Sequence, residues 1–115
     1  DTIAMESILM GAKGWIAGLV DAFPEETVAI YTYCKAGEWE KARAIFRWFL
    51  PLLELDISPQ LVQNIKLCEQ ATGLGTGYVR KPRLTLEGTE LKRVELIIKE
   101  SLVNRPKNLD YKNYL

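Results

Sequence analysis

The sequence contains no histidine, and this absence removes several kinds of site at once. Histidine is the commonest protein ligand for zinc and the usual general base near neutral pH. The only two cysteines, Cys34 and Cys68, lie far apart in the chain. A structural zinc site and a Ser-His or Cys-His nucleophile are therefore excluded within this sequence, and we expect no metal and no other cofactor.

Net charge and long apolar runs are also lacking. Fifteen Lys and Arg residues balance fifteen Asp and Glu residues, so no long-range field would attract nucleic acid or a membrane surface, and we expect neither as a partner. A membrane helix needs about 20 consecutive apolar residues, but Lys13, Asp21 and Arg47 interrupt the three richest stretches. Two isolated thiols in apolar patterns indicate a cytoplasmic setting. Because the chain begins at Asp1 and not at Met, we expect it to belong to a longer polypeptide.

One segment alone has the pattern of a β-strand. Residues 14–20, Gly-Trp-Ile-Ala-Gly-Leu-Val, are apolar without alternation, which is typical of a strand buried on both faces. Each buried and unpaired backbone group of such a strand would cost roughly 1–3 kcal/mol. We therefore expect the neighbouring strands to lie outside this sequence. Without them, the segment should pair with another copy, rest against a separate chain, or lose its strand form.

Most of the remaining chain is predicted to be helical. Apolar periodicity and capping signals predict helices over residues 2–10, 24–36, 39–53, 59–72 and 87–102. We expect Pro51 to kink or divide the third helix, and we expect Ser58 to cap the fourth with Pro59 at its first position.

Two segments lack any helical pattern. Residues 73–85 hold three glycines and are predicted to form a loop. The polar tail, residues 104–115, is expected to fray or to be disordered, although Tyr111 and Tyr114 could dock on a neighbour.

Three local features suggest chemistry but have simpler explanations. The Gly-x-Gly-x-Gly string at 73–77 follows a helix, whereas a phosphate-binding turn follows a strand, so it is interpreted as a helix stop. The basic cluster at 80–83 is interpreted as a solvated loop or a partner of acidic helix residues. Lys13 precedes the predicted strand, whereas barrel enzymes place their chemistry at the carboxyl ends of strands. We therefore do not assign it a catalytic role.

Three segments, in this order and spacing, are similar to one enzyme family. They are Gly-Ala-Lys-Gly-Trp-Ile-Ala-Gly-Leu-Val-Asp-Ala-Phe-Pro-Glu-Glu at 11–26, Lys-Ala-Gly-Glu-Trp-Glu-Lys-Ala-Arg-Ala-Ile-Phe at 35–46, and Phe-Leu-Pro-Leu-Leu at 49–53. Together with the Pro-Arg-Leu loop at 82–84, they make residues 1–103 resemble the C-terminal part of the dihydrodipicolinate synthase and N-acetylneuraminate lyase family.

The resemblance implies an α/β fold class, namely the C-terminal fragment of a (β/α)₈ TIM barrel with a helical extension. Residues 1–37 would be the end of the barrel, with helix 7 at 2–10, strand 8 at 14–20 and helix 8 at 24–36. Residues 38–103 would be the C-terminal helical extension and residues 104–115 a polar tail. The chain itself would be predominantly helical.

The resemblance also implies an activity. Members of this family are lyases or aldolases that form a Schiff base between a lysine and pyruvate or a related 2-oxo acid. That lysine lies on the sixth strand, outside this sequence, so the chain alone is expected to be inactive and to supply the closing strand and a pocket wall. Its partners would be the remainder of the barrel, the 2-oxo acid and further copies in a homo-oligomer.

The substrate-binding residues implied by the resemblance are Ile16, Ala17 and Gly18. Ile16 matches an apolar residue that packs against the bound 2-oxo acid in this family. Ala17 stands where many members have serine, so a hydroxyl contact would be lost there, and Gly18 follows it. No catalytic residue and no metal ligand is carried over.

A second interpretation comes from a different class of protein. Residues 37–46, Gly-Glu-Trp-Glu-Lys-Ala-Arg-Ala-Ile-Phe, resemble the middle of a tetratricopeptide repeat, a helical-repeat module that binds peptides. Such repeats recur at about 34 residues, but residues 71–80 fall in the glycine loop. The lyase interpretation is therefore preferred.

Overall fold

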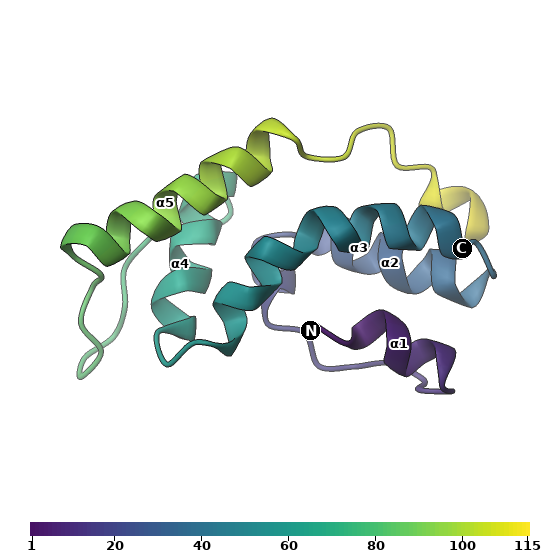
Figure 1. Ribbon diagram of the computed structural model, residues 1–115, viewed down its shortest axis with the longest axis horizontal. Coiled ribbons are helices and arrows are strands. Elements are labelled where there is room, and N and C mark those ends of the chain that lie inside the picture. The colour runs from purple at the N-terminus through teal and green to yellow at the C-terminus, as the bar shows by residue number, and fades with distance from the viewer.

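The computed structural model describes residues 1–115 and contains helices but no strand (Figure 1). The α-helices are α1 (Ala4–Leu9), α2 (Pro24–Lys35), α3 (Trp39–Leu53), α4 (Leu61–Thr72) and α5 (Gly88–Val103). Short 3₁₀ helices are η1 (Leu19–Asp21), η2 (Glu54–Ile57) and η3 (Tyr111–Tyr114). None of the helices combines the length and the apolar character needed to span a lipid bilayer.

The helices form an elongated body of 43 × 27 × 20 Å. A short link turns α2 back onto α3, and α1 lies against this antiparallel pair, while α4 and α5 occupy the other end (Figure 1). The ring of Phe23 meets the rings of Trp48 and Phe49 edge-on, with centroids 5.8 and 5.4 Å away. The Trp48 Nε1–H donates a hydrogen bond of 2.8 Å to the Ser101 carbonyl oxygen. This aromatic cluster therefore joins α2, α3 and α5.

The five predicted helices are present, and the end signals at Pro24, Gly37 and Gly73 act as expected. Pro24 is the first residue of α2, where its missing N–H needs no partner, and Glu25 and Glu26 lie at the positive end of the helix dipole. Gly37 and Gly73 follow α2 and α4 with φ angles of 79° and 77°. Glycine adopts this left-handed conformation without the steric penalty that a Cβ atom brings, so both helices end there.

Two details of the predicted helices are wrong. Helix α4 begins at Leu61, because the Ser58 Oγ accepts the Gln60 N–H at 3.0 Å and so fixes a turn before the helix. Division of α3 at Pro51 is also wrong, because the helix continues to Leu53, whereas a kink at this residue stays a prediction. Proline removes only one N–H from the last turn of this helix, and the buried side chains of Leu52 and Leu53 hold that turn against the core.

The strand predicted over residues 14–20 is absent. Residues 12–17 have no regular secondary structure, and residues 19–21 form η1. The physical reason is that the chain offers no second strand to accept and donate the ladder hydrogen bonds. Of the three outcomes expected for an unpartnered strand, loss of strand form is the one observed.

The prediction of a frayed tail is also wrong. Residues 104–115 return to α2, where η3 packs and Tyr111 is buried. The guanidinium of Arg105 holds the buried carboxylate of Glu26 with two hydrogen bonds of 2.9 and 3.0 Å. The partners lie 79 residues apart, so no local pattern reveals them. The tyrosines of the tail dock on their own chain.

The core makes a direct stability prediction. Leu52 is fully buried, so Leu52→Ala should lower the free energy of unfolding by about 2–5 kcal/mol, as buried leucine truncations do. The matched control is Leu84→Ala in the exposed loop, where a change within about 0.5 kcal/mol is expected. Urea denaturation followed by circular dichroism measures both variants. Equal changes in the free energy of unfolding for the two variants would contradict the burial of Leu52 in the core.

Candidate functional site

The irregular segment between α1 and α2, residues 12–18, contains the three residues predicted to bind substrate. The carboxylate of Asp1 holds this segment by side-chain and backbone hydrogen bonds. It accepts the Trp15 Nε1–H at 2.7 Å. The same carboxylate accepts the backbone N–H groups of Gly18 and Leu19 at 2.9 and 3.2 Å. These bonds hold the segment in place although it belongs to no sheet.

The three predicted residues are consecutive, but they differ in exposure. Ile16 is 100% exposed, whereas Ala17 and Gly18 are half-buried and Leu19 beyond them is fully buried. A fully exposed isoleucine flanked by half-buried residues is an apolar side chain without a partner. The segment therefore presents Ile16 to solvent and turns into the core after Gly18.

A small cavity of about 340 Å³ lies between this segment and α2. Its lining residues come from the segment, from η1 and from α2: Lys13, Gly14, Trp15, Ala17, Val20, Thr27, Val28 and Tyr31. The Tyr31 hydroxyl donates a hydrogen bond of 3.1 Å to the Lys13 carbonyl oxygen and so ties the segment to α2. Ala17 lines this cavity, whereas Ile16 and Gly18 do not.

Gly18 is also the point where the C-terminal helices reach the segment. A Cβ atom placed on Gly18 would lie 2.5 Å from a carboxylate oxygen of Asp56, which belongs to η2. Burial raises the pKa of Asp56; the N-terminal ammonium group partly offsets this rise, and the nearby charge of Asp21 adds to it. Sequence reasoning missed Asp56, because nothing in its local pattern shows that η2 packs against residue 18.

The other candidates behave as the simpler interpretations predicted. Gly73 ends α4, and the residues after it form a loop up to α5 instead of entering a helix, so the glycine string is a helix stop. The basic residues at 80–83 are exposed in this loop and make no ion pair, which confirms a solvated loop. Lys13 is exposed on the rim of the small cavity.

The two cysteines are buried and do not form a disulfide. Burial raises the pKa of the Cys34 thiol to about 11 and that of the Cys68 thiol to about 12. Both thiols are therefore protonated near neutral pH, and a protonated thiol is a poor nucleophile and metal ligand. No group of three Cys, Asp or Glu side chains is arranged to hold a metal ion.

The raised pKa of Asp56 makes a prediction about pH. Because folding raises this pKa, the folded state binds the proton more tightly than the unfolded state does. The free energy of unfolding therefore falls as the pH rises above 3.8, the ordinary pKa of an Asp carboxyl group. Replacing the carboxyl with an amide, Asp56→Asn, should therefore raise the free energy of unfolding more at pH 7 than at pH 3. Urea denaturation at both pH values measures this difference. The control is Glu54→Gln, on the exposed side of η2. An effect of Asp56→Asn that is equal at pH 7 and at pH 3 would contradict the raised pKa of Asp56.

Comparison with known proteins identifies the family. Residues 1–101 match the model of the Dihydrodipicolinate synthetase family. The 4-hydroxy-tetrahydrodipicolinate synthase of Methanococcus maripaludis strain C5 is 27% identical over 93 residues, which are 80% of this chain and 32% of that protein. The enzyme of the same name from Methanocaldococcus jannaschii is 26% identical over 100 residues, or 87% of this chain and 35% of that protein. The chain spans about a third of the length of these curated relatives, and it belongs to the dihydrodipicolinate synthase family of lyases.

Proposed function

We propose that this chain is the C-terminal portion of a family lyase or aldolase that forms a lysine Schiff base with pyruvate or a related 2-oxo acid. The observation that carries the proposal is the family match over residues 1–101. The relatives that it matches are about three times as long and are synthases by name. The remaining strands of a (β/α)₈ barrel would come from the part that this chain does not contain.

In this proposal, residues 14–20 become the closing strand when neighbouring strands are supplied. Residues 14–17 make no backbone–backbone hydrogen bond in the isolated chain, so their N–H and C=O groups are free to pair. The flanking helices α1 and α2 give the order helix, strand, helix that ends a barrel of this class. Residues 1–37 would then be barrel, residues 38–103 helical extension and residues 104–115 tail.

The exposed isoleucine has a specific role in this arrangement. Ile16 would pack against the bound 2-oxo acid, and this contact would bury the apolar side chain that the isolated chain leaves in water. Ala17 would offer no hydroxyl to the substrate, and Gly18 would keep the strand end close to η2. Together they would form a wall that excludes water from the reacting atoms.

The chemistry belongs to the lysine on the missing part. A protonated imine nitrogen withdraws electrons from the former carbonyl carbon and so stabilises the enamine. In the aldol direction this enamine attacks an aldehyde, and in the cleavage direction the same enamine is formed. The exposed Lys13 lies before the proposed strand, on the opposite side from the catalytic face. The chain alone is therefore proposed to be inactive. A homo-oligomeric assembly, a cytoplasmic location and the absence of nucleic-acid and membrane partners are parts of the same proposal.

The helical-repeat alternative is less well supported. Helices α2 and α3 do form an antiparallel pair around residues 37–46, as a repeat module would. The family match nevertheless runs through this pair without a break. A repeat one period later would occupy residues 71–80, which hold the end of α4 and the loop.

Reductive trapping tests the proposal. Pyruvate and borohydride should give no adduct on this chain alone, because the chain lacks the catalytic lysine. When the chain is co-expressed with a polypeptide that supplies the preceding two thirds of the Methanocaldococcus jannaschii relative, an adduct should appear on that polypeptide. Mass spectrometry of both chains, with and without pyruvate, locates it. An adduct on Lys13 of this chain would overturn the proposal.

A matched pair of variants tests the pocket wall in the same assay. Ile16→Asp should reduce the adduct yield at least tenfold, because it places an unpaired charge against the bound acid, and tenfold corresponds to about 1.4 kcal/mol. Ile57→Asp changes another exposed isoleucine, in η2, and should leave the yield unchanged. Equal adduct yields from the two variants would contradict the assignment of Ile16 to the substrate site.

A further inference from the structure

A groove of about 600 Å³ lies between α4 and α5, which occupy the same end of the molecule (Figure 1). Its apolar lining comes from both helices: Leu67 and Ala71 of α4, and Ile98, Leu102 and Val103 of α5. The side chain of Val103 is 74% exposed, and Ala71 is exposed as well. An exposed apolar surface that is bordered by polar residues is typical of a site for a protein partner.

Two charged side chains, Glu95 and Lys99 of α5, line the same groove and are exposed. A glutamate four residues before a lysine is the favourable order for an ion pair within one helix. Neither residue forms an ion pair in the structure. One carboxylate and one ammonium group are therefore available to a partner, beside apolar side chains.

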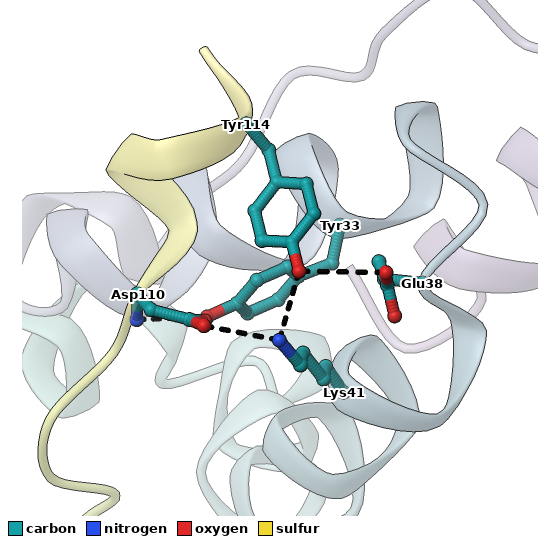
Figure 2. Close-up of polar contacts among 5 residues, drawn as sticks. All are labelled: Tyr33, Glu38, Lys41, Asp110 and Tyr114. Carbon is teal, nitrogen blue, oxygen red and sulfur yellow. Dashed lines mark hydrogen bonds and ion pairs between the residues drawn. The ribbon is translucent and has the colours of Figure 1, made fainter.

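The charged groups beside a second hollow, formed by α2, α3 and residues 106–110, are in a different situation (Figure 2). The carboxylate of Asp110 accepts hydrogen bonds from the Tyr33 hydroxyl at 2.5 Å and from the Lys41 ammonium at 3.0 Å. Lys41 also donates to the Tyr114 hydroxyl at 2.9 Å. These charges are paired within the chain, whereas those of the α4–α5 groove are not.

The free charges belong to a row of residues on α5 that are four positions apart: Leu91, Glu95, Lys99 and Val103. Such a row forms a ridge on the surface of a helix, and helices pack by fitting ridges into grooves. The row is apolar, acidic, basic and apolar in sequence. In a second copy that runs in the opposite direction, each acid meets a base, and Leu91 meets Val103. The ridge is therefore complementary in charge to itself about a two-fold axis.

We propose that the α4–α5 groove binds a second copy of this chain, with α5 packed antiparallel against α5 of that copy. The dimer contains two symmetric ion pairs between Glu95 of one copy and Lys99 of the other. Burial of the apolar lining drives the association, and the two charge pairs fix its direction and register. This interface would serve the homo-oligomer named in the proposed function, but it does not rest on the lyase activity.

Charge reversals in the 115-residue chain test the pairing. Glu95→Lys places two ammonium groups opposite each other at both pairs, and Lys99→Glu places two carboxylates there. Each single variant should therefore raise the dissociation constant of the dimer at least about tenfold. The double variant restores opposite charges and should dimerise within about threefold of the unchanged chain, because the two changes are coupled. An equal mixture of the single variants should form a 1:1 dimer. Sedimentation equilibrium measures these constants.

The matched controls are Lys35→Glu and Glu40→Lys, which reverse exposed charges on either side of the α2–α3 link and should leave the dissociation constant unchanged. Circular dichroism establishes that all variants keep their helices. The proposal fails if the unchanged chain stays monomeric up to about 1 mM. It also fails if the single variants dimerise as tightly as the unchanged chain, or if neither the double variant nor the mixture recovers dimerisation.

The apolar part of the interface has a test of its own. Val103→Asp places a charge against the apolar lining and should weaken dimerisation at least about tenfold. Leu84→Asp changes a leucine of similar exposure in the loop and should have no effect. If the two variants weaken dimerisation equally, the groove is not the interface.

A different occupant of the groove would give a different result. The methyl signals of Val103 in nuclear magnetic resonance spectra should shift as the concentration of the chain alone increases. If they shift only when a polypeptide that supplies the preceding two thirds of the Methanocaldococcus jannaschii relative is added, the groove binds that polypeptide and the dimer is refuted. Pyruvate trapping by the same assembly is measured separately, so a failure of this inference is distinguishable from a failure of the proposed function.

Discussion

A β-strand can satisfy its backbone groups only by pairing with another strand, and this chain has one candidate strand and no partner for it. Residues 14–17 make no backbone–backbone hydrogen bond and have no regular secondary structure. The side chains of Asp1 and Tyr31 hold the segment between α1 and α2 instead.

Helix α2 contacts three other parts of the molecule. One side packs on α3 through the core that contains Ala29 and Ile30. Another carries Tyr31, which bonds to the irregular segment. The face that carries Ala29 and Ile30 also carries Glu26 and Tyr33, which bind Arg105 and Asp110 of the C-terminal residues. A single helix therefore contacts the candidate site, α3 and the C-terminal residues.

Local signals predicted what depends on local structure. Pro24, Gly37 and Gly73 marked helix ends correctly, because their effects act on their own backbone. The strand was predicted wrongly as a formed element, since an apolar run shows what a segment can bury but not whether its partners are present. The prediction of a frayed tail was wrong for a related reason. The groups that bind Arg105 and Asp110 lie in helices that are distant in the sequence. Of the candidate site, the sequence indicated the segment and its three residues but not the contact between Gly18 and Asp56.

Amide hydrogen exchange of residues 14–17 tests most directly whether this segment is the closing strand of a barrel. In the isolated chain these amides should exchange at nearly the rate of an unstructured peptide, while the Ile30 amide in α2 is protected and serves as an internal reference. Assembly with a polypeptide that carries the other strands should slow the four amides by roughly 100-fold or more, since each ladder hydrogen bond must open before exchange. If they stay unprotected in an assembly that traps pyruvate, the segment is not a strand of that barrel, and its assignment as the closing strand is contradicted.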